Sequence, residues 1–186
     1  GHTVGYSGIE TFDITAASID GELVGADGST SFYVNIPDNQ VTVAGGAEID
    51  TLVVNYGAAT DSIFTAGSNL IRSGGNVYGV TYSGIEKFNV STGGGNDSIA
   101  TGTGFDTVRT GAGDDSIDTG TGAAVVDGGA GTDIWRADLS AANQGGALNL
   151  NLAGVQSFLG GSVANIELID LKTGGGADTT TTAIGA

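Results

Sequence analysis

The strongest constraint in this sequence is a nine-residue repeat that runs five times without interruption across residues 92–136. The copies read TGGGNDSIA, TGTGFDTVR, TGAGDDSID, TGTGAAVVD and GGAGTDIWR. Glycine holds the second and fourth places of every copy, aspartate holds the sixth place in all but the fourth copy, and an apolar residue always holds the eighth. A repeat this short predicts that each copy is one small unit of a stacked array.

Each place in the repeat has a predicted role. The first six places predict a tight turn, because glycine accepts positive φ and lets neighbouring backbone come close. The last three predict a short strand whose middle side chain faces inward, since alternate strand residues point to opposite sides. If two copies form one coil, the odd copies stack on one side and the even copies on the other. The expected interior residues are Ile99, Val108, Ile117, Val126 and Trp135.

One aliphatic side chain per copy gives a core too thin to stabilise this array alone. The burial of a single Ile or Val does not offset the conformational entropy that is lost when a whole copy is ordered. The aspartates indicate the missing contribution, because Ca²⁺ takes about six to eight oxygen ligands and accepts carboxylates together with backbone carbonyls. A glycine-rich turn exposes carbonyls, and the sixth place supplies a carboxylate. The pattern therefore predicts calcium between successive turns.

The stacking order predicts which carboxylates meet. Asp97, Asp115 and Asp133 would form one ladder with two sites between its rungs, and therefore at least two bound Ca²⁺ ions. On the other side Asp106 would face Ala124, where the expected aspartate is missing, so we expect this site to be weak or empty. A metal-free array would leave the ladder carboxylates close together without compensation, which is electrostatically unfavourable.

The five copies resemble the RTX (hemolysin-type) calcium-binding repeat, GGxGxDxUx with U a large apolar residue, although Thr replaces the first Gly in four of them. The resemblance implies a parallel β-roll, or β-solenoid, that binds Ca²⁺ between turns through aspartate carboxylates and glycine-turn carbonyls. It also implies a large secreted or cell-surface bacterial protein that leaves the cell by type I (one-step) secretion. The residues that would carry the calcium role are Asp97, Asp115, Asp133, Asp106, Asp178, Gly93, Gly95, Gly111, Gly113, Gly129 and Gly131.

Two degenerate copies lie outside the tandem array. Residues 173–181 keep Asp178 but have Thr180 at the apolar place. Residues 45–53 keep Asp50 but have Glu48 at the fourth place, where glycine belongs. The number of bound ions therefore stays open at both positions.

A longer period lies behind the short one. The stretches YSGIETFDIT, YSGIEKFNVS and VANIELIDLK align around Glu10, Glu86 and Glu167, and residues 50–59 align with residues 133–142. A glutamate that recurs at equivalent places favours a structural role, such as capping, over a unique active site.

We expect an all-β chain in which longer strand blocks flank the tandem array. The four expected blocks are the end of a strand block with an inserted hairpin (1–44), a strand block with a degenerate repeat (45–91), the tandem array (92–136), and a second strand block ending in a degenerate repeat (137–186). Within the strand blocks, residues 51–56 and 80–90 alternate apolar and polar side chains as half-buried strands do.

Composition restricts the function classes. The chain has 35 Gly, one Pro, 21 acidic and five basic residues, and a formal net charge of −16. Five scattered bases cannot follow a phosphate backbone or an anionic membrane surface, so we expect no nucleic-acid partner and no membrane insertion. Cysteine is absent and His2 is the only histidine, so the residues for a zinc site or an interior His-based triad are missing and we expect no enzyme.

The predicted function is an extracellular calcium-binding module that folds on Ca²⁺ binding and acts as a scaffold or spacer in an adhesin- or toxin-like protein, next to other domains of the same long chain. Three alternatives stay open. The chain could be a non-catalytic C-terminal part of a secreted RTX enzyme. It could bind carbohydrate or ice on a row of hydroxyls from Thr101, Thr103, Thr119 and Thr121. The glycine-rich tract could be a flexible linker, although a linker has no reason to repeat apolar residues at a fixed interval.

Overall fold

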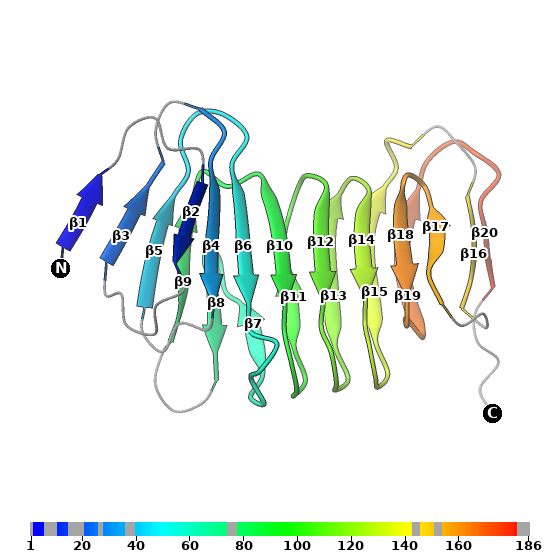
Figure 1. Cartoon of the computed structure of the whole chain (residues 1–186). Helices are drawn as coiled ribbons and strands as arrows, with labels where there is room; N and C mark the ends of the chain where they lie inside the picture. Colours follow the sequence, from blue (N-terminus) through cyan, green and yellow to red (C-terminus); the bar gives the residue numbers. More distant parts are fainter. Residues whose placement is uncertain are drawn as a thin grey trace.

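The structure, a computed structural model, describes residues 2–5, 11–14, 21–25, 28–35, 40–73, 78–142, 146–150 and 154–181. These residues form strands and turns and contain no helix, which confirms the all-β prediction. The described part of the chain accordingly has no helix with the length and hydrophobicity needed to cross a bilayer. Figure 1 shows the strands arranged side by side in a long series, with the N-terminal strands at one end and the C-terminal strands at the other.

Most strands belong to two sheets. The ten-stranded sheet has the order β1 (His2–Gly5), β3 (Gly21–Val24), β5 (Gln40–Ala44), β9 (Tyr78–Ser83), β8 (Asn69–Arg72), β7 (Ile63–Thr65), β11 (Ser98–Ala100), β13 (Ser116–Thr121), β15 (Ile134–Leu139) and β19 (Leu168–Thr173). The eight-stranded sheet has the order β17 (Gln156–Phe158), β18 (Gly161–Ala164), β14 (Ala124–Asp127), β12 (Asp106–Arg109), β10 (Lys87–Ser91), β6 (Thr51–Asn55), β4 (Ser31–Asn35) and β2 (Thr11–Ile14). A separate parallel pair joins β16 (Ala147–Asn149) to β20 (Thr179–Thr181).

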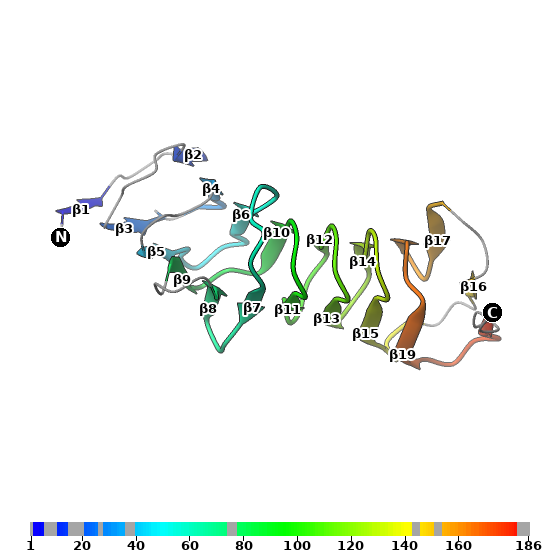
Figure 2. The ribbon, with the colours of Figure 1, turned by 90° about the horizontal axis from the view of Figure 1, so that it is seen from below.

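Within the tandem array the chain passes to the opposite sheet after every strand. β11, β13 and β15 lie in the ten-stranded sheet, and β12 and β14 lie in the eight-stranded sheet (Figure 2). Parallel pairing joins residues two copies apart, as in Ile99 with Ile117 and Ile117 with Trp135. The odd copies therefore stack on one side and the even copies on the other, as the nine-residue pattern predicts.

The core lies between the two sheets. The eighth-place residues of the five copies are all buried, with at most 1% exposure. In the eight-stranded sheet one row of valines crosses neighbouring strands: Val54, Val90, Val108, Val126 and Val163. Trp135 packs edge-to-face on Phe158 at a ring separation of 6.3 Å, and its Nε1 donates to Thr119 Oγ1 at 3.0 Å. The tandem array and the strand blocks therefore share one continuous core.

The hairpin expected within residues 1–44 is not found among the described strands. β3 and β5 pair in parallel with each other, and β4 lies in the other sheet. The reason is that each of the strands β1 to β5 pairs in parallel with strands from neighbouring passages of the chain rather than with its sequence neighbour. The alternation across residues 80–90 is likewise divided between β9 and β10, which belong to opposite sheets.

Antiparallel pairing occurs elsewhere. β8 pairs antiparallel with both β7 and β9, so these three strands form an inserted meander in the ten-stranded sheet. Gly67, at φ 59°, lies in the tight turn between β7 and β8, a conformation that glycine adopts at little cost. β17 and β18 form a second antiparallel pair beyond the tandem array.

Candidate metal centre

The aspartate ladder, defined as Asp97, Asp115 and Asp133, crosses the starts of β11, β13 and β15. Each residue is buried, with at most 2% exposure. Asp115 Oδ1 accepts the backbone N–H of Asp97 at 2.7 Å, and Asp133 Oδ1 accepts that of Asp115 at 2.9 Å. Asp97 Oδ1 accepts the N–H of Ile63 in the same way, at 2.7 Å. The structure therefore brings the three predicted residues together, and each carboxylate binds the backbone of the rung before it.

The second oxygen of each ladder carboxylate has no hydrogen-bond partner in the protein. Oδ2 is buried and unpartnered in all three ladder residues. A buried carboxylate oxygen without a donor or a cation is costly, because charged groups are stable in protein interiors only when they are paired, hydrogen-bonded or bound to metal. Binding of a cation or a proton to this oxygen would remove the energetic cost of its burial.

The electrostatic surroundings favour a proton in the metal-free ladder. Burial raises the pKa of Asp97 and of Asp133 from 3.8 to about 6, against the opposing effect of their hydrogen bonds. The Asp115 carboxylate contributes to both of these shifts, and Glu167 and Asp114 contribute to the shift at Asp133. Loss of water and repulsion between like charges act in the same direction here.

No basic side chain neutralises the ladder within the described residues. The ion pairs found there join Arg72 to Asp61 at 2.7 Å, Lys172 to Asp138 at 2.8 Å and Arg136 to Asp170 at 3.8 Å. These pairs are partly exposed, and exposed pairs contribute little to stability. With a formal net charge of −16 on the chain, compensation at the ladder has to come from solution.

The glycines predicted to supply carbonyls lie in the turns that precede the ladder residues. All except Gly93 have φ between 93° and 144°: Gly95, Gly111, Gly113, Gly129 and Gly131. A Cβ at Gly113 would collide with the Gly95 carbonyl oxygen, and a Cβ at Gly131 would collide with the Gly113 carbonyl oxygen. The fourth-place carbonyls therefore point along the stack into the next turn, where only glycine leaves room for them.

The second-place carbonyls are already used by the backbone. Gly93 O accepts the N–H of Ala112 and Gly111 O accepts the N–H of Ala130, each at 2.7 Å. A carbonyl oxygen has two lone pairs, so this bond leaves one acceptor position on each.

Threonine at the first place forms a row of hydrogen bonds beside the ladder. Thr92 Oγ1 donates to the Thr110 carbonyl at 2.8 Å, and Thr110 Oγ1 donates to the Gly128 carbonyl at 2.8 Å. The Thr92 hydroxyl also lies next to the Asp97 carboxyl, but its proton is directed at Thr110. Threonine in place of the first glycine of the repeat thus adds hydrogen bonds between turns. It leaves Asp97 Oδ2 without a donor.

Asp106 repeats the ladder geometry once, in the eight-stranded sheet. Its Oδ1 accepts the N–H of Phe88 at 2.9 Å, and its buried Oδ2 has no partner. Burial raises its pKa, while the nearby Thr101 hydroxyl and the Phe88 N–H act against the shift. Ala124, also buried, stands in register with Asp106 and offers no carboxylate. The predicted register of Asp106 with Ala124 is confirmed, and the weak calcium site expected there stays a prediction.

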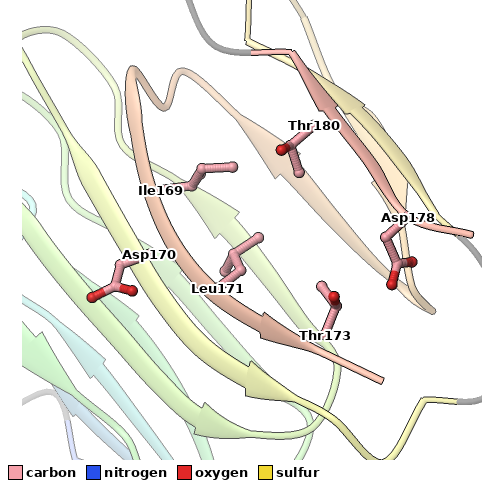
Figure 3. A pocket seen from close by; sticks show the side chains of 6 residues that line it. All are labelled: Ile169, Asp170, Leu171, Thr173, Asp178 and Thr180. Atoms are coloured by element: carbon pink, nitrogen blue, oxygen red, sulfur yellow. The ribbon is translucent and has the colours of Figure 1, made fainter. Parts of the chain in front are cut away.

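Asp178 lies apart from the ladder, just before β20. Its Oδ1 accepts the N–H of Gly146 at 2.9 Å, but the residue is only partly buried. Figure 3 shows it in a pocket between β19 and β20. The pocket is lined by Ile169, Asp170, Leu171, Thr173, Asp178 and Thr180. Asp178 therefore accepts a backbone N–H as the ladder residues do. It is more exposed than they are, and it lies in another part of the structure.

The row of four threonine hydroxyls is not present at the surface. Thr101 and Thr119 are buried, at 8% and 1% exposure, and Thr119 Oγ1 accepts the Trp135 indole N–H. Thr103 and Thr121 are exposed and form a parallel bridge with each other. The prediction was wrong for the first place of the repeat, because the turn directs that side chain into the stack.

Three acidic residues outside the tandem array share this geometry; calcium binding was left open at one of them, Asp50, and the other two were not predicted as site residues. Asp50 is fully buried with an unpartnered Oδ2. Glu86 Oε2 accepts the N–H of Asp50 at 2.9 Å, and Glu167 Oε2 accepts the N–H of Asp133 at 2.8 Å. The structural role expected for these two glutamates is confirmed, while Glu10 lies outside the described residues. The recurrence of the glutamate in the longer period was the available signal.

The donor set at the ladder suits a hard divalent cation. Nowhere in the described residues do three or more His, Cys, Asp or Glu side chains converge to hold a metal by side chains alone. A cation at the ladder would need backbone carbonyls or water in addition to carboxylates, which is the mixed oxygen coordination that Ca²⁺ accepts. Nitrogen and sulfur ligands, which zinc and copper prefer, are missing from the ladder.

Comparisons of this chain with models of protein families, with curated proteins and with solved structures found no match.

Proposed function

We propose that this chain is a calcium-binding module of the RTX type, in which glycine-rich turns stack as a parallel β-roll and hold Ca²⁺ between them. In this proposal the module folds when calcium binds and serves as a scaffold or spacer in a secreted or surface-attached bacterial protein. The observation that supports it most is the buried, unpartnered Oδ2 on three successive rungs.

A cation between rungs would remove both unfavourable features of the ladder. It would give each Oδ2 a ligand, and it would neutralise carboxylates that raise one another's pKa. A ligand that binds only the folded state adds about 1.4 kcal/mol per site when its concentration is about ten times Kd. Two ladder sites would then contribute roughly 3 kcal/mol, which is a large fraction of the stability of a small domain.

Conditional folding also suits export. Where calcium is scarce, uncompensated carboxylates and the net charge of −16 oppose compaction. Calcium sites of extracellular modules commonly have Kd values of about 10⁻⁴–10⁻³ M, so a site of this strength fills only outside the cell. Folding would then follow binding, because a preformed site does not exist in the unfolded chain.

Calcium titration of the chelated protein tests the proposal. We expect far-UV circular dichroism to show little strand in chelator and a cooperative gain as Ca²⁺ is added. Mg²⁺ should be much less effective, since it demands near-ideal octahedral geometry and dehydrates reluctantly. A strand spectrum that is complete in chelator and unchanged by calcium would refute the proposal.

A matched pair of variants locates the effect. Asp115→Asn keeps an oxygen to accept the Asp97 N–H but removes the charge from the centre of the ladder. We expect the calcium midpoint to rise about tenfold, which corresponds to about 1.4 kcal/mol. Asp114→Asn removes the same charge from the adjacent exposed residue, whose Oδ1 accepts the Thr132 N–H at 2.8 Å. Equal shifts in both variants would indicate general charge screening rather than a site.

The hydroxyl-surface alternative has less support than the scaffold function. Two of its four threonines are buried, and a ligand surface needs all four hydroxyls to be accessible. Membership in a longer secreted enzyme is compatible with the same calcium sites and is decided by the sequence that adjoins this chain.

A further inference from the structure

Glu167 extends the geometry of the aspartate ladder by one rung. It is in register with Asp133, because the following residues, Ile134 and Leu168, pair in parallel. Its Oε2 accepts the Asp133 N–H at 2.8 Å, which is the bond that each ladder aspartate makes to the rung before it. Glu167 therefore stands where the next aspartate would stand.

The same arrangement recurs around Glu86 and Asp50 in the eight-stranded sheet. These residues are in register, because Lys87 pairs in parallel with Thr51. Glu86 Oε2 accepts the Asp50 N–H at 2.9 Å, and Asp50 Oδ1 accepts the Thr30 N–H at 2.7 Å. Glu86 and Asp50 thus form a two-rung ladder that is separate from the tandem array.

An unpartnered buried oxygen lies at the first of these pairs. Asp50 is 0% exposed, and its Oδ2 has no hydrogen-bond partner. A Cβ added at Gly45 would lie 2.6 Å from this Oδ2 and would also collide with the Gly84 carbonyl oxygen. Oδ2 and the Gly84 carbonyl therefore converge on the same side of Gly45, and the Glu86 carboxylate contacts the backbone N–H of the same aspartate.

The second pair repeats this construction. Asp133 is 0% exposed with an unpartnered Oδ2. A Cβ at Gly128 would lie 2.5 Å from that oxygen and would collide with the Asn165 carbonyl oxygen. Asn165 has φ 51°, close to the 59° of Gly84, so the carbonyl that precedes each glutamate leaves the chain in the same left-handed turn.

We propose that each glutamate completes a divalent-cation site with the aspartate that it contacts, Glu86 with Asp50 and Glu167 with Asp133. The ligand would be a hard cation of the Ca²⁺ class, because every available donor is a carboxylate or carbonyl oxygen. This inference rests on the proposed function and extends it, since it places cations in the strand blocks as well as in the tandem array.

The number of calcium ions bound by the full chain tests the inference. We would measure it by equilibrium dialysis with radioactive calcium for the unmodified protein, for Glu86→Gln and for Glu167→Gln. Glutamine keeps the side-chain oxygen that accepts the backbone N–H, so only the charge changes. Each variant is expected to bind one ion fewer than the unmodified protein.

Two control variants separate a site from a general charge effect. Glu48→Gln and Asp170→Asn remove one charge each from exposed residues close to Asp50 and Glu167 in the chain. Both are expected to bind as many ions as the unmodified protein. A loss of one ion in these controls as well would overturn the inference.

The remaining outcomes distinguish the two proposals. Unchanged ion numbers in Glu86→Gln and Glu167→Gln, with calcium still bound by the ladder, would overturn this inference alone. No calcium binding by the unmodified protein would overturn the proposed function with it. Should a glutamine variant fail to fold, crystals of the unmodified protein grown with calcium decide. Ion density at Asp50 and Glu86 supports the site, and its absence beside an occupied ladder rejects it.

Discussion

The two edges of the tandem array use the same turn but differ in their acidic residues. Along the ten-stranded sheet the aspartate ladder continues into Glu167, whereas along the eight-stranded sheet Asp106 has Ala124 in register. The strands nevertheless pair on both sides, and β12 and β14 pair over all of Asp106–Arg109. Strand register at one edge therefore does not depend on a carboxylate in every rung. The comparison teaches that the period of the repeat sets the register, while the number of acidic rungs sets how much charge each edge must compensate.

The largest expected effect comes from the core beneath the ladder. Trp135→Ala should lower the free energy of unfolding in saturating calcium by about 3–5 kcal/mol, because it leaves a cavity and removes the donor to Thr119. If the stability of the core and the binding of calcium are independent, the folded variant binds as many calcium ions as the unmodified protein. Urea unfolding and dialysis measure the two quantities. Val155→Ala, at a residue that is 74% exposed, serves as the control and should change stability by less than about 0.5 kcal/mol.

The next effect compares the two edges directly. Asp115→Ala and Asp106→Ala each remove the acceptor of one buried N–H, of Asp97 and Phe88 respectively, at a cost of about 1–3 kcal/mol. Asp115 also borders both ladder sites, so its loss should raise the calcium midpoint by about tenfold or more, equivalent to about 1.4 kcal/mol. Asp106→Ala should raise it much less. Similar midpoints for the two variants, measured by circular dichroism, would contradict the asymmetry.

A gain-of-site variant would make the two edges alike. Ala124→Asp places a carboxylate in register with Asp106, where it can accept the Asp106 N–H as the ladder residues do. In saturating calcium we expect one additional bound ion, and at a calcium concentration too low to fill the new site we expect lower stability from the added repulsion. Ala123→Asp, at the adjacent and partly exposed residue, adds the same charge and should bind no additional ion. Dialysis and thermal unfolding at high and low calcium provide the measurements.

The fourth prediction is a dependence of strand content on pH, which calcium should reverse. The pKa of Asp97 and Asp133 is about 6 in the fold, against an ordinary value of 3.8, so the folded state binds protons more tightly than the unfolded state. In chelator, the stabilisation is fully present below about pH 4 and is lost as the pH rises through about 6. Acid should therefore increase strand content without calcium, as followed by circular dichroism.

Calcium competes with those protons for the same oxygens, so its midpoint should rise as the pH falls below about 6. The double variant Asp97→Asn, Asp133→Asn provides the control and should flatten both trends. An unmodified protein whose calcium-free strand content is the same at about pH 4.5 and pH 7 would argue against proton uptake by the ladder.

The sequence predicts the fold well where local pattern and stacking agree. Within the tandem array, glycine spacing and the eighth-place residues are sufficient to place the strands and their register, and Val90 pairs with Val108 as an extension of the same row. The meander of β7, β8 and β9 was not predicted. Its strands are short apolar runs. The sequence pattern of such a run does not indicate whether the following strand pairs with it in the same sheet or lies in the opposite sheet.

The site was predictable to the same degree. The three ladder residues and the gap at Ala124 follow from the period, since residues two copies apart must meet. Asp50 was obscured because its turn lacks the glycine of the fourth place. The inward direction of Thr101 and Thr119 depends on the path of the turn, which composition does not specify.

The ladder has a polarity that follows from its hydrogen bonds. Every acidic side chain serves the amide of the rung upstream of it, from Glu167 through Asp133 and Asp115 to Asp97. Deleting one acid therefore exposes an amide on its N-terminal neighbour and leaves its C-terminal neighbour intact. Such units can be concatenated in only one orientation, and the loss of one acid affects the neighbouring unit nearer the start of the chain.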